Sequence, residues 1–273
     1  RSSGMPEGHV IHRLASSLNR EFAGQETAVS SPQGRFATEA DQLNHTVLKH
    51  AEAHGKHLFI DFEANQAAHI VYIHLGLIGS LRFSDLAEPR GQVRLRIASD
   101  SRAADLRGPQ WCRLITDEEK DTAIGKLGAD PLDPHADPSR SFQRIKRSSK
   151  PISTLLMDQH IFAGVGNIYR AETLFRLGLN PELRGKDLTD DDLHAIWNDL
   201  VETMTRGLRV GKIDTVRPEH MPEAMGREPR VDAHGGEVYV YRRAGLPCYV
   251  CGTAIVERKV DGRNLFWCPT CQS

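Results

Sequence analysis

The feature that most constrains this chain is a set of paired cysteines near its end. Four of the five cysteines form two C-x-x-C pairs separated by sixteen residues, with Asp261-Gly262 between the pairs. In a cytosolic chain this spacing indicates a tetrahedral Zn²⁺ site rather than disulfides, and Asp-Gly is typical of a hairpin turn. We therefore expect one structural zinc ion in a C-terminal β-hairpin, held by Cys248, Cys251, Cys268 and Cys271.

Four thiolates leave no open coordination position, so this zinc indicates folding rather than catalysis. The last segment, about thirty residues, is too short to build a core without the metal. A disulfide-linked or metal-free fold is the alternative. Arg258, Lys259 and Arg263 stand at the expected hairpin tip, where they could contact phosphate.

Charge and hydropathy limit the classes of partner. The formal net charge is −1, which argues weakly against a nucleic-acid partner. The basic residues are clustered, however, and one cluster comprises Arg144, Lys146, Arg147 and Lys150. Its alternative interpretation is a solvated surface. No apolar run approaches the ~20 residues of a membrane span, and no secretory signal stands out. We expect a cytoplasmic protein that does not bind membranes.

The rest of the chain predicts an α+β fold. Apolar residues at helical spacing over 10–18 predict an N-terminal helix. Short runs rich in β-forming residues between 47 and 115 then predict a β-sandwich with helices attached. Cys112 falls in one of these runs and is expected to be a buried free thiol. Gly128 to Pro134 indicates a domain boundary, and helical patterns dominate from Pro151 onward.

The start of the chain offers a reactive group. Arg1 to Gly4 resemble the remnant of a cleaved tag, so the natural chain would begin at Met5. Removal of Met5 would leave Pro6 as a terminal secondary amine, and an amine can attack a carbonyl to form a Schiff base. Glu7 follows directly as an acid. The alternative is that Pro6 is the first residue of a helix, with Glu7 favoured by the helix dipole.

Three features now coincide: Pro6-Glu7, the segment Gly164 to Tyr169, and the cysteine hairpin with Gly262 to Pro269. In this combination the chain resembles the formamidopyrimidine-DNA glycosylase and endonuclease VIII family of base-excision repair enzymes. Met5 to Gly8 looks more like the endonuclease VIII branch. After the tag remnant at residues 1–4, the resemblance implies an N-terminal β-sandwich catalytic domain at residues 5–134, a helix–two-turn–helix domain at 135–240 and a zinc-finger hairpin at 241–273.

The resemblance also implies a mechanism. Pro6 would attack the sugar C1′ of a damaged nucleotide and expel the base, while Glu7 protonates the ring oxygen. β- and δ-elimination would then cut the strand, so the expected enzyme is a DNA glycosylase and AP lyase. Lys56 matches the family's hairpin lysine, which contacts the phosphate and assists catalysis. Arg263 matches its zinc-finger arginine, which binds phosphates flanking the lesion, and the resemblance places both residues with Pro6 and Glu7 in the catalytic site. The alternatives are a solvated turn lysine and a surface arginine.

Further DNA contacts follow from the same resemblance. Asn167 matches the family's helix–two-turn–helix asparagine, with an ordinary N-cap as the alternative. Lys150 matches a basic residue at the start of that motif. An apolar wedge must fill the gap left by a flipped base, and Leu77 is the candidate, with Ile78 second and a buried strand-end leucine as the alternative. Glu172 matches an acid that supports the Pro6 end, or else is a solvent-exposed helix acid.

Substrate range is the point on which the sequence departs from the better-known branches. His9 stands where those branches carry proline, and residues 217–236, expected to be a loop, do not match the segment with which the purine-specific branch covers its lesion. We expect oxidised pyrimidines as substrates. The alternatives are a purine-directed enzyme acting on formamidopyrimidines or 8-oxoguanine, and a non-catalytic protein that binds damaged DNA. The expected partner is DNA with damaged bases or abasic sites, bound by a monomer that associates with the nucleoid in a bacterium.

Overall fold

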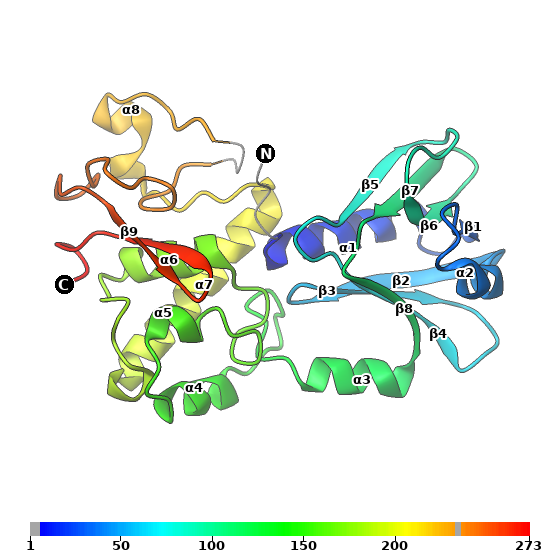
Figure 1. Ribbon diagram of the computed structural model, residues 1–273, viewed down its shortest axis with the longest axis horizontal. Helices are drawn as coiled ribbons and strands as arrows, with labels where there is room; N and C mark the ends of the chain where they lie inside the picture. The colour runs from blue at the N-terminus through cyan, green and yellow to red at the C-terminus, as the bar shows by residue number, and fades with distance from the viewer. Residues whose placement is uncertain (1–5, 233–235) are drawn as a thin grey trace. The chain divides into compact units, whose positions relative to one another are not determined.

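The computed structural model describes residues 6–232 and 236–273, so the proposed tag remnant and Met5 lie outside the described residues. The chain divides into two compact units, Arg1–Lys126 and Leu127–Ser273. Figure 1 shows the sheet and helices of the first unit and the helices and hairpin of the second. In the described part of the chain, no helix combines the length and apolar character that a membrane span needs.

The first unit contains an eight-stranded antiparallel sheet in the order β5-β7-β6-β1-β2-β3-β4-β8. β1 pairs with β2 on one side and β6 on the other, so it joins the two halves of the predicted β-sandwich. The strands are β1 (Glu26–Ser30), β2 (Thr46–His54), β3 (His57–Phe62), β4 (Ala68–His74), β5 (Ser80–Asp85), β6 (Val93–Ala98), β7 (Arg102–Arg107) and β8 (Trp111–Thr116).

Three helices accompany this sheet: α1 (Gly8–Phe22), α2 (Ala37–Leu43) and α3 (Asp117–Gly125). The helical spacing near the N-terminus correctly predicted α1, whose buried face includes Ile11, Leu18 and Phe22. These side chains pack with apolar residues of both sheet halves into one core. Burial of that shared apolar surface is the main force that stabilises the unit. α1 begins at Gly8, immediately after Pro6 and Glu7.

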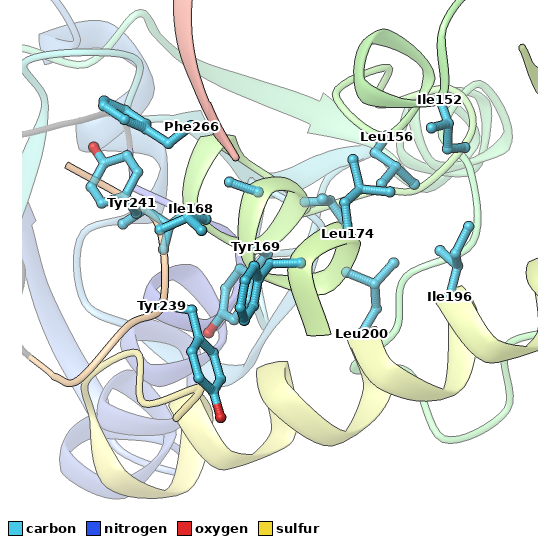
Figure 2. Packing of buried hydrophobic residues seen from close by; sticks show 14 of the residues in the cluster. Ile152, Leu156, Ile168, Tyr169, Leu174, Ile196, Leu200, Tyr239, Tyr241 and Phe266 are labelled. Carbon is cyan, nitrogen blue, oxygen red and sulfur yellow. The ribbon is translucent and has the colours of Figure 1, made fainter. Parts of the chain in front are cut away.

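The second unit is mainly helical and ends in a two-stranded hairpin. Its elements are α4 (Ser139–Lys146), α5 (Ile152–Leu155), α6 (Asn167–Arg176), η1 (Gly185–Asp187), α7 (Asp190–Val210), η2 (Pro218–His220), α8 (Pro222–Met225), β9 (Val256–Val260) and β10 (Arg263–Trp267). Figure 2 shows its core, in which Leu174 of α6 and Leu200 of α7 lie with Tyr239 and Phe266. The helical and hairpin segments thus share one core.

Local signals in the second unit were mostly correct. Thr189 and Asp192 form a capping box at the start of α7, and this Thr-x-x-Asp spacing can be recognised in the sequence. The segment 217–236, predicted to be a loop without regular structure, instead contains η2 and α8. A proline at the start of each favours a helical turn, and Gly226 ends α8 in the left-handed region. The prediction was wrong because turns this short leave no periodic apolar pattern.

Candidate active site

Pro6 precedes the first helix instead of lying inside it. Glu7 is the N-cap of α1, with extended backbone angles, and the first helical residue is Gly8. The alternative in which Pro6 is the first residue of the helix is therefore wrong. Glu7 is only 5% exposed, and its side chain makes no capping hydrogen bond. At the helix N-terminus, the amide of Val10 donates to the Glu7 carbonyl at 3.0 Å.

His9 follows in the first turn of α1 and is buried. Burial, together with the nearby charges of Arg13 and His12, lowers the pKa of His9 to about 4. The imidazole is therefore neutral at physiological pH. A neutral residue here adds no positive charge beside Pro6 and Glu7.

Lys56 lies in the two-residue turn between β2 and β3, where His54 pairs with His57. Gly55 takes a positive φ of 58°, which a side chain would disfavour. Lys56 is only 6% exposed, so the alternative of a solvated turn lysine is wrong. Burial lowers the pKa of His74 in β4, and the charge of Lys56 lowers it further. The two side chains are thus electrostatic neighbours.

The turn after β4 carries the candidate wedge. Leu77 is 56% exposed and Ile78 is more exposed still, so the alternative of a buried strand-end leucine is wrong. The turn closes through a 3.0 Å bond from the Gly76 amide to Nδ1 of His74 and a 3.1 Å bond from the Gly79 amide to the Leu75 carbonyl. A Cβ at Gly79 would lie 2.3 Å from that carbonyl oxygen, so the turn requires glycine there.

In the second unit, Asn167 is the first residue of α6 and Gly166 is its N-cap, so the alternative of an ordinary N-cap asparagine is wrong. The side chain of Asn167 bonds other elements instead. Its Nδ2 donates to the Asn264 carbonyl of β10 at 2.9 Å, and its Oδ1 accepts from Arg170. Arg263 precedes Asn264 and is half-buried. The structure therefore brings the two predicted phosphate-binding residues of this unit onto directly bonded elements.

Lys150 is exposed at the start of the helix–two-turn–helix segment. Its carbonyl accepts from the Gly185 amide at 3.0 Å, which fixes the backbone while the side chain faces solvent. In the same basic cluster, Arg144 donates to the His160 carbonyl and Lys146 pairs with Asp190.

Glu172 is fully buried in α6, and the alternative of a solvent-exposed helix acid is wrong. Its carboxylate accepts from the backbone amides of Tyr239, Val240 and Tyr241 at 2.6 to 3.1 Å, and from the Thr215 hydroxyl. Bonds from backbone N–H groups to a carboxylate are strong, charge-assisted ones. Glu172 therefore fixes the segment leading into the hairpin.

The four hairpin cysteines form one cluster. Their Sγ atoms all lie within 4.8 Å of one another, with Cys248 to Cys271 at 3.9 Å and Cys251 to Cys268 at 3.4 Å. Tetrahedral zinc with Zn–S bonds of about 2.3 Å separates its sulfurs by about 3.8 Å. The donor set and spacing fit Zn²⁺. The remaining cysteine, Cys112, is only partly buried, and burial raises the pKa of its thiol to about 12, which makes it unreactive.

Sequence reasoning did not single out Arg170, His74 or the amides of residues 239–241. Arg170 lies three residues after Asn167, a spacing that places both on one helix face, so that signal was available. The amides carry no side-chain signal at all.

Comparison with known proteins gives a consistent assignment. Residues 5–110 match the formamidopyrimidine-DNA glycosylase N-terminal domain, 127–218 match the formamidopyrimidine-DNA glycosylase H2TH domain, and 245–273 match the zinc finger found in FPG and IleRS. Lactococcus lactis Fpg, solved in complex with an abasic site containing DNA, superposes with a TM-score of 0.80 at 21% identity over 98% of this chain and 99% of that one. At that identity the likeness supports the fold alone.

Two curated relatives match along their whole length. Endonuclease 8 1 of Mycobacterium tuberculosis is 48% identical, with 98% of this chain and 100% of that protein covered. The formamidopyrimidine-DNA glycosylase of a Synechococcus species is 30% identical, with 98% of each chain covered. The chain therefore belongs to the formamidopyrimidine-DNA glycosylase and endonuclease VIII family of DNA repair enzymes.

Proposed function

We propose that this protein is a bifunctional DNA glycosylase and AP lyase of base-excision repair that prefers oxidised pyrimidines. The observation that carries the proposal is the position of Pro6, which stands outside α1 next to the buried carboxylate of Glu7. A terminal secondary amine with an acid beside it suits Schiff-base chemistry. The 48% identity to a protein named Endonuclease 8 1 supports the same activity.

The reaction proceeds in balanced steps. The Pro6 nitrogen bonds to C1′ as the glycosidic bond breaks, and the damaged base leaves with the bonding pair. The proton that the Pro6 nitrogen loses neutralises the departing base, and Glu7 gives a proton to the ring oxygen, which opens the sugar and yields an iminium ion. Loss of a C2′ proton then expels the 3′ phosphate, and a second elimination expels the 5′ phosphate. Proton transfers of this kind typically contribute 10²- to 10⁴-fold to the rate.

The remaining site residues hold the DNA. Lys56, Asn167, Arg263 and Lys150 are assigned to backbone phosphates, and Leu77 to the gap left by the extruded nucleotide. The exposure of Leu77 supports its role, because a wedge has to protrude before DNA arrives. The partner in this proposal is DNA that contains damaged bases or abasic sites, bound by a monomer at the bacterial nucleoid.

The cysteine cluster is assigned one structural zinc ion. Cys248, Cys251, Cys268 and Cys271 would hold it with all four positions filled, so the ion supplies folding free energy and no reaction step. The ion keeps Arg263 on a formed hairpin.

Chemical blocking of Pro6 separates this mechanism from others. With residues 1–5 attached, the Pro6 nitrogen is part of an amide, and amide resonance removes its lone pair from reaction. We expect the chain with this extension to bind DNA without forming an imine. The form that starts at Pro6 is expected to be active.

Base excision on matched duplexes tests the function and the substrate preference. The form that starts at Pro6 is incubated in excess with duplexes carrying 5-hydroxyuracil or 8-oxoguanine, and cut strands are measured in a single turnover. Faster cutting at 5-hydroxyuracil, with 3′-phosphate ends, is expected. Faster cutting at 8-oxoguanine would support the purine-directed alternative. Binding without cutting on either duplex would support the non-catalytic one.

A further inference from the structure

Arg170 stands out because it is a large cation that the proposed chemistry does not use, and it is only 1% exposed. It lies one helical turn after Asn167 on α6, at a spacing that places both side chains on one face. Its Nε and Nη2 donate to Oδ1 of Asn167 at 3.1 and 2.8 Å, and its Nη1 donates to the Ser153 carbonyl at 2.8 Å. The guanidinium therefore holds the oxygen of the Asn167 side-chain amide with two hydrogen bonds, and the Ser153 carbonyl in turn holds the guanidinium.

These two hydrogen bonds fix the orientation of the Asn167 side-chain amide. A flipped amide would place its NH₂ group against the guanidinium, and both groups are only donors. With Oδ1 held by two N–H groups, Nδ2 must face away from Arg170. A cation bonded to the amide oxygen also polarises the N–H bonds of Nδ2, which makes them better donors.

The outward face of the amide meets the zinc hairpin. One Nδ2 hydrogen goes to the Asn264 carbonyl at 2.9 Å, and Asn264 follows Arg263 on β10. The hairpin is tied to the helical segment a second time, where the Thr154 hydroxyl donates to the Asp261 carboxylate at 3.3 Å. Figure 1 shows the hairpin lying against α6 within the second unit.

We propose that Arg170 is a positioning residue that presets the Asn167 amide, and through the Asn264 carbonyl holds Asn167 and Arg263 in one arrangement for binding consecutive DNA phosphates. The hydrogen bonds from Arg170 to Asn167 and from Asn167 to Asn264 join the helix and the hairpin into a single preformed phosphate site. The proposal rests on the DNA-binding role assigned above. Preformed donors lower the ordering cost of binding, so loss of Arg170 weakens affinity more than it slows chemistry.

Arg176 provides a matched control on the same helix. It is also a buried arginine, and its Nε donates to Asp199 while Nη1 donates to the Thr215 carbonyl. Its bonds serve the core of the unit and do not involve Asn167. Lysine keeps the positive charge in either place but lacks the planar fork that holds an amide oxygen with two N–H groups.

The experiment compares Arg170→Lys with Arg176→Lys in binding to a duplex that carries an uncleavable abasic-site analogue. Arg170→Lys is expected to weaken binding about tenfold and to reduce the salt slope by about one unit, as one lost phosphate contact does. Excision at saturating DNA is expected to stay within about threefold of the parent. Arg176→Lys is expected to leave the salt slope unchanged. Equal slopes for the two variants would overturn the proposal.

A double-mutant cycle with Asn167→Ala provides the second test. If Arg170 acts through Asn167, adding Arg170→Lys to Asn167→Ala has no further effect on affinity, whereas additive losses would overturn the proposal. Hydrogen exchange of the side-chain amides in the parent protein provides a third test, which needs neither DNA nor a substitution. The Asn167 NH₂ hydrogens are expected to exchange at least about tenfold more slowly than those of exposed Asn65. Equal exchange would contradict the preset amide, whereas absence of excision would count against the proposed function alone.

Discussion

Glu7 in the first unit and Glu172 in the second are both buried glutamates, and they differ in what surrounds them. The carboxylate of Glu172, in the second unit, accepts three backbone N–H groups and a hydroxyl. Glu7, in the first unit, stands at a helix N-terminus without making a capping bond, next to a proline that precedes the helix. The Glu172 carboxylate has a structural role, because backbone amides and a hydroxyl hold it. The contrast supports the proposal that Glu7, which adjoins Pro6 in the sequence, is the acid that takes part in the chemistry.

Zinc removal is expected to have the largest effect, and only in the second unit. Structural zinc sites contribute apparent binding free energies of about 10–16 kcal/mol, so chelation should unfold the hairpin. Amide exchange at β9 and β10 should rise to unprotected rates while β3 and β4 stay protected. A hairpin that keeps its protection in excess chelator would break the assignment of zinc to folding.

Glu7→Gln should have the next largest effect, and it should be on rate. Loss of a proton-transfer group lowers rates by about 10²- to 10⁴-fold. Glutamine has nearly the same shape as glutamate and keeps the backbone bond from the Val10 amide, so the thermal midpoint should change less than the excision rate. Single-turnover excision and thermal melting measure the two quantities. Retained excision with a lowered midpoint would reverse the role assigned to this acid.

Glu172→Gln should show the opposite pattern. The side-chain NH₂ group of glutamine would face backbone N–H groups that now donate to the Glu172 carboxylate, and two donors cannot bond each other. The free energy of unfolding of the second unit should therefore fall by about 3 kcal/mol. Denaturant melting of the two variants side by side sharpens the comparison. Equal stability losses for Glu7→Gln and Glu172→Gln would remove the distinction between the two acids.

Arg263→Ala should weaken binding to damaged and undamaged duplexes alike. A lost phosphate contact reduces the salt slope by about one unit and has no sequence preference. Lys259→Ala, at an exposed position of the same hairpin, is the control and should change the slope less. Titrations at several salt concentrations give both slopes. Loss of binding to damaged DNA only would mean that Arg263 recognises the lesion instead.

The smallest expected effect is a pH dependence of the first unit. His69 lies between Asp61 and Asp117, at 2.6 and 3.0 Å. Burial lowers its pKa, but hydrogen bonds to the two carboxylates outweigh that effect, and the pKa is raised above 6.5. The contribution of protonated His69 to the stability of the folded protein is therefore fully present below pH 6.5 and is lost as the pH rises through the raised pKa. Solvent screening limits it to less than about 1 kcal/mol.

Melting of His69→Asn and the parent at pH 5.5 and 8.5 checks this sign. The stability difference between the two proteins should be larger at pH 5.5. A larger difference at pH 8.5 would mean that neutral histidine is the stabilising form.

Much of the fold could be predicted because its signals are local. The helical spacing of Ile11 and Leu18 indicated α1, Thr189 indicated the start of α7, and the cysteine spacing indicated the metal cluster. Short helices such as α8 escaped because one turn leaves no periodicity. The candidate site was found mainly through resemblance to a family, since Lys56 and Leu77 are unremarkable as single residues.

The contacts that organise the site could not be predicted. Glu172 was expected to be exposed as readily as buried, because backbone amides far along the chain hold it and leave no trace in residue types. The same holds for the carbonyl of Asn264, which Asn167 bonds across nearly a hundred residues. Long-range bonds to backbone have no sequence pattern.

The Pro6 nitrogen is the proposed nucleophile, and borohydride trapping on an abasic-site oligonucleotide tests this assignment directly. Borohydride reduces an imine to a stable bond, so any Schiff base becomes a covalent protein–DNA adduct. We expect an adduct from the form that starts at Pro6, and none from the chain in which residues 1–5 precede it. An adduct from both forms would contradict the claim and point to a lysine, with Lys56 the first candidate.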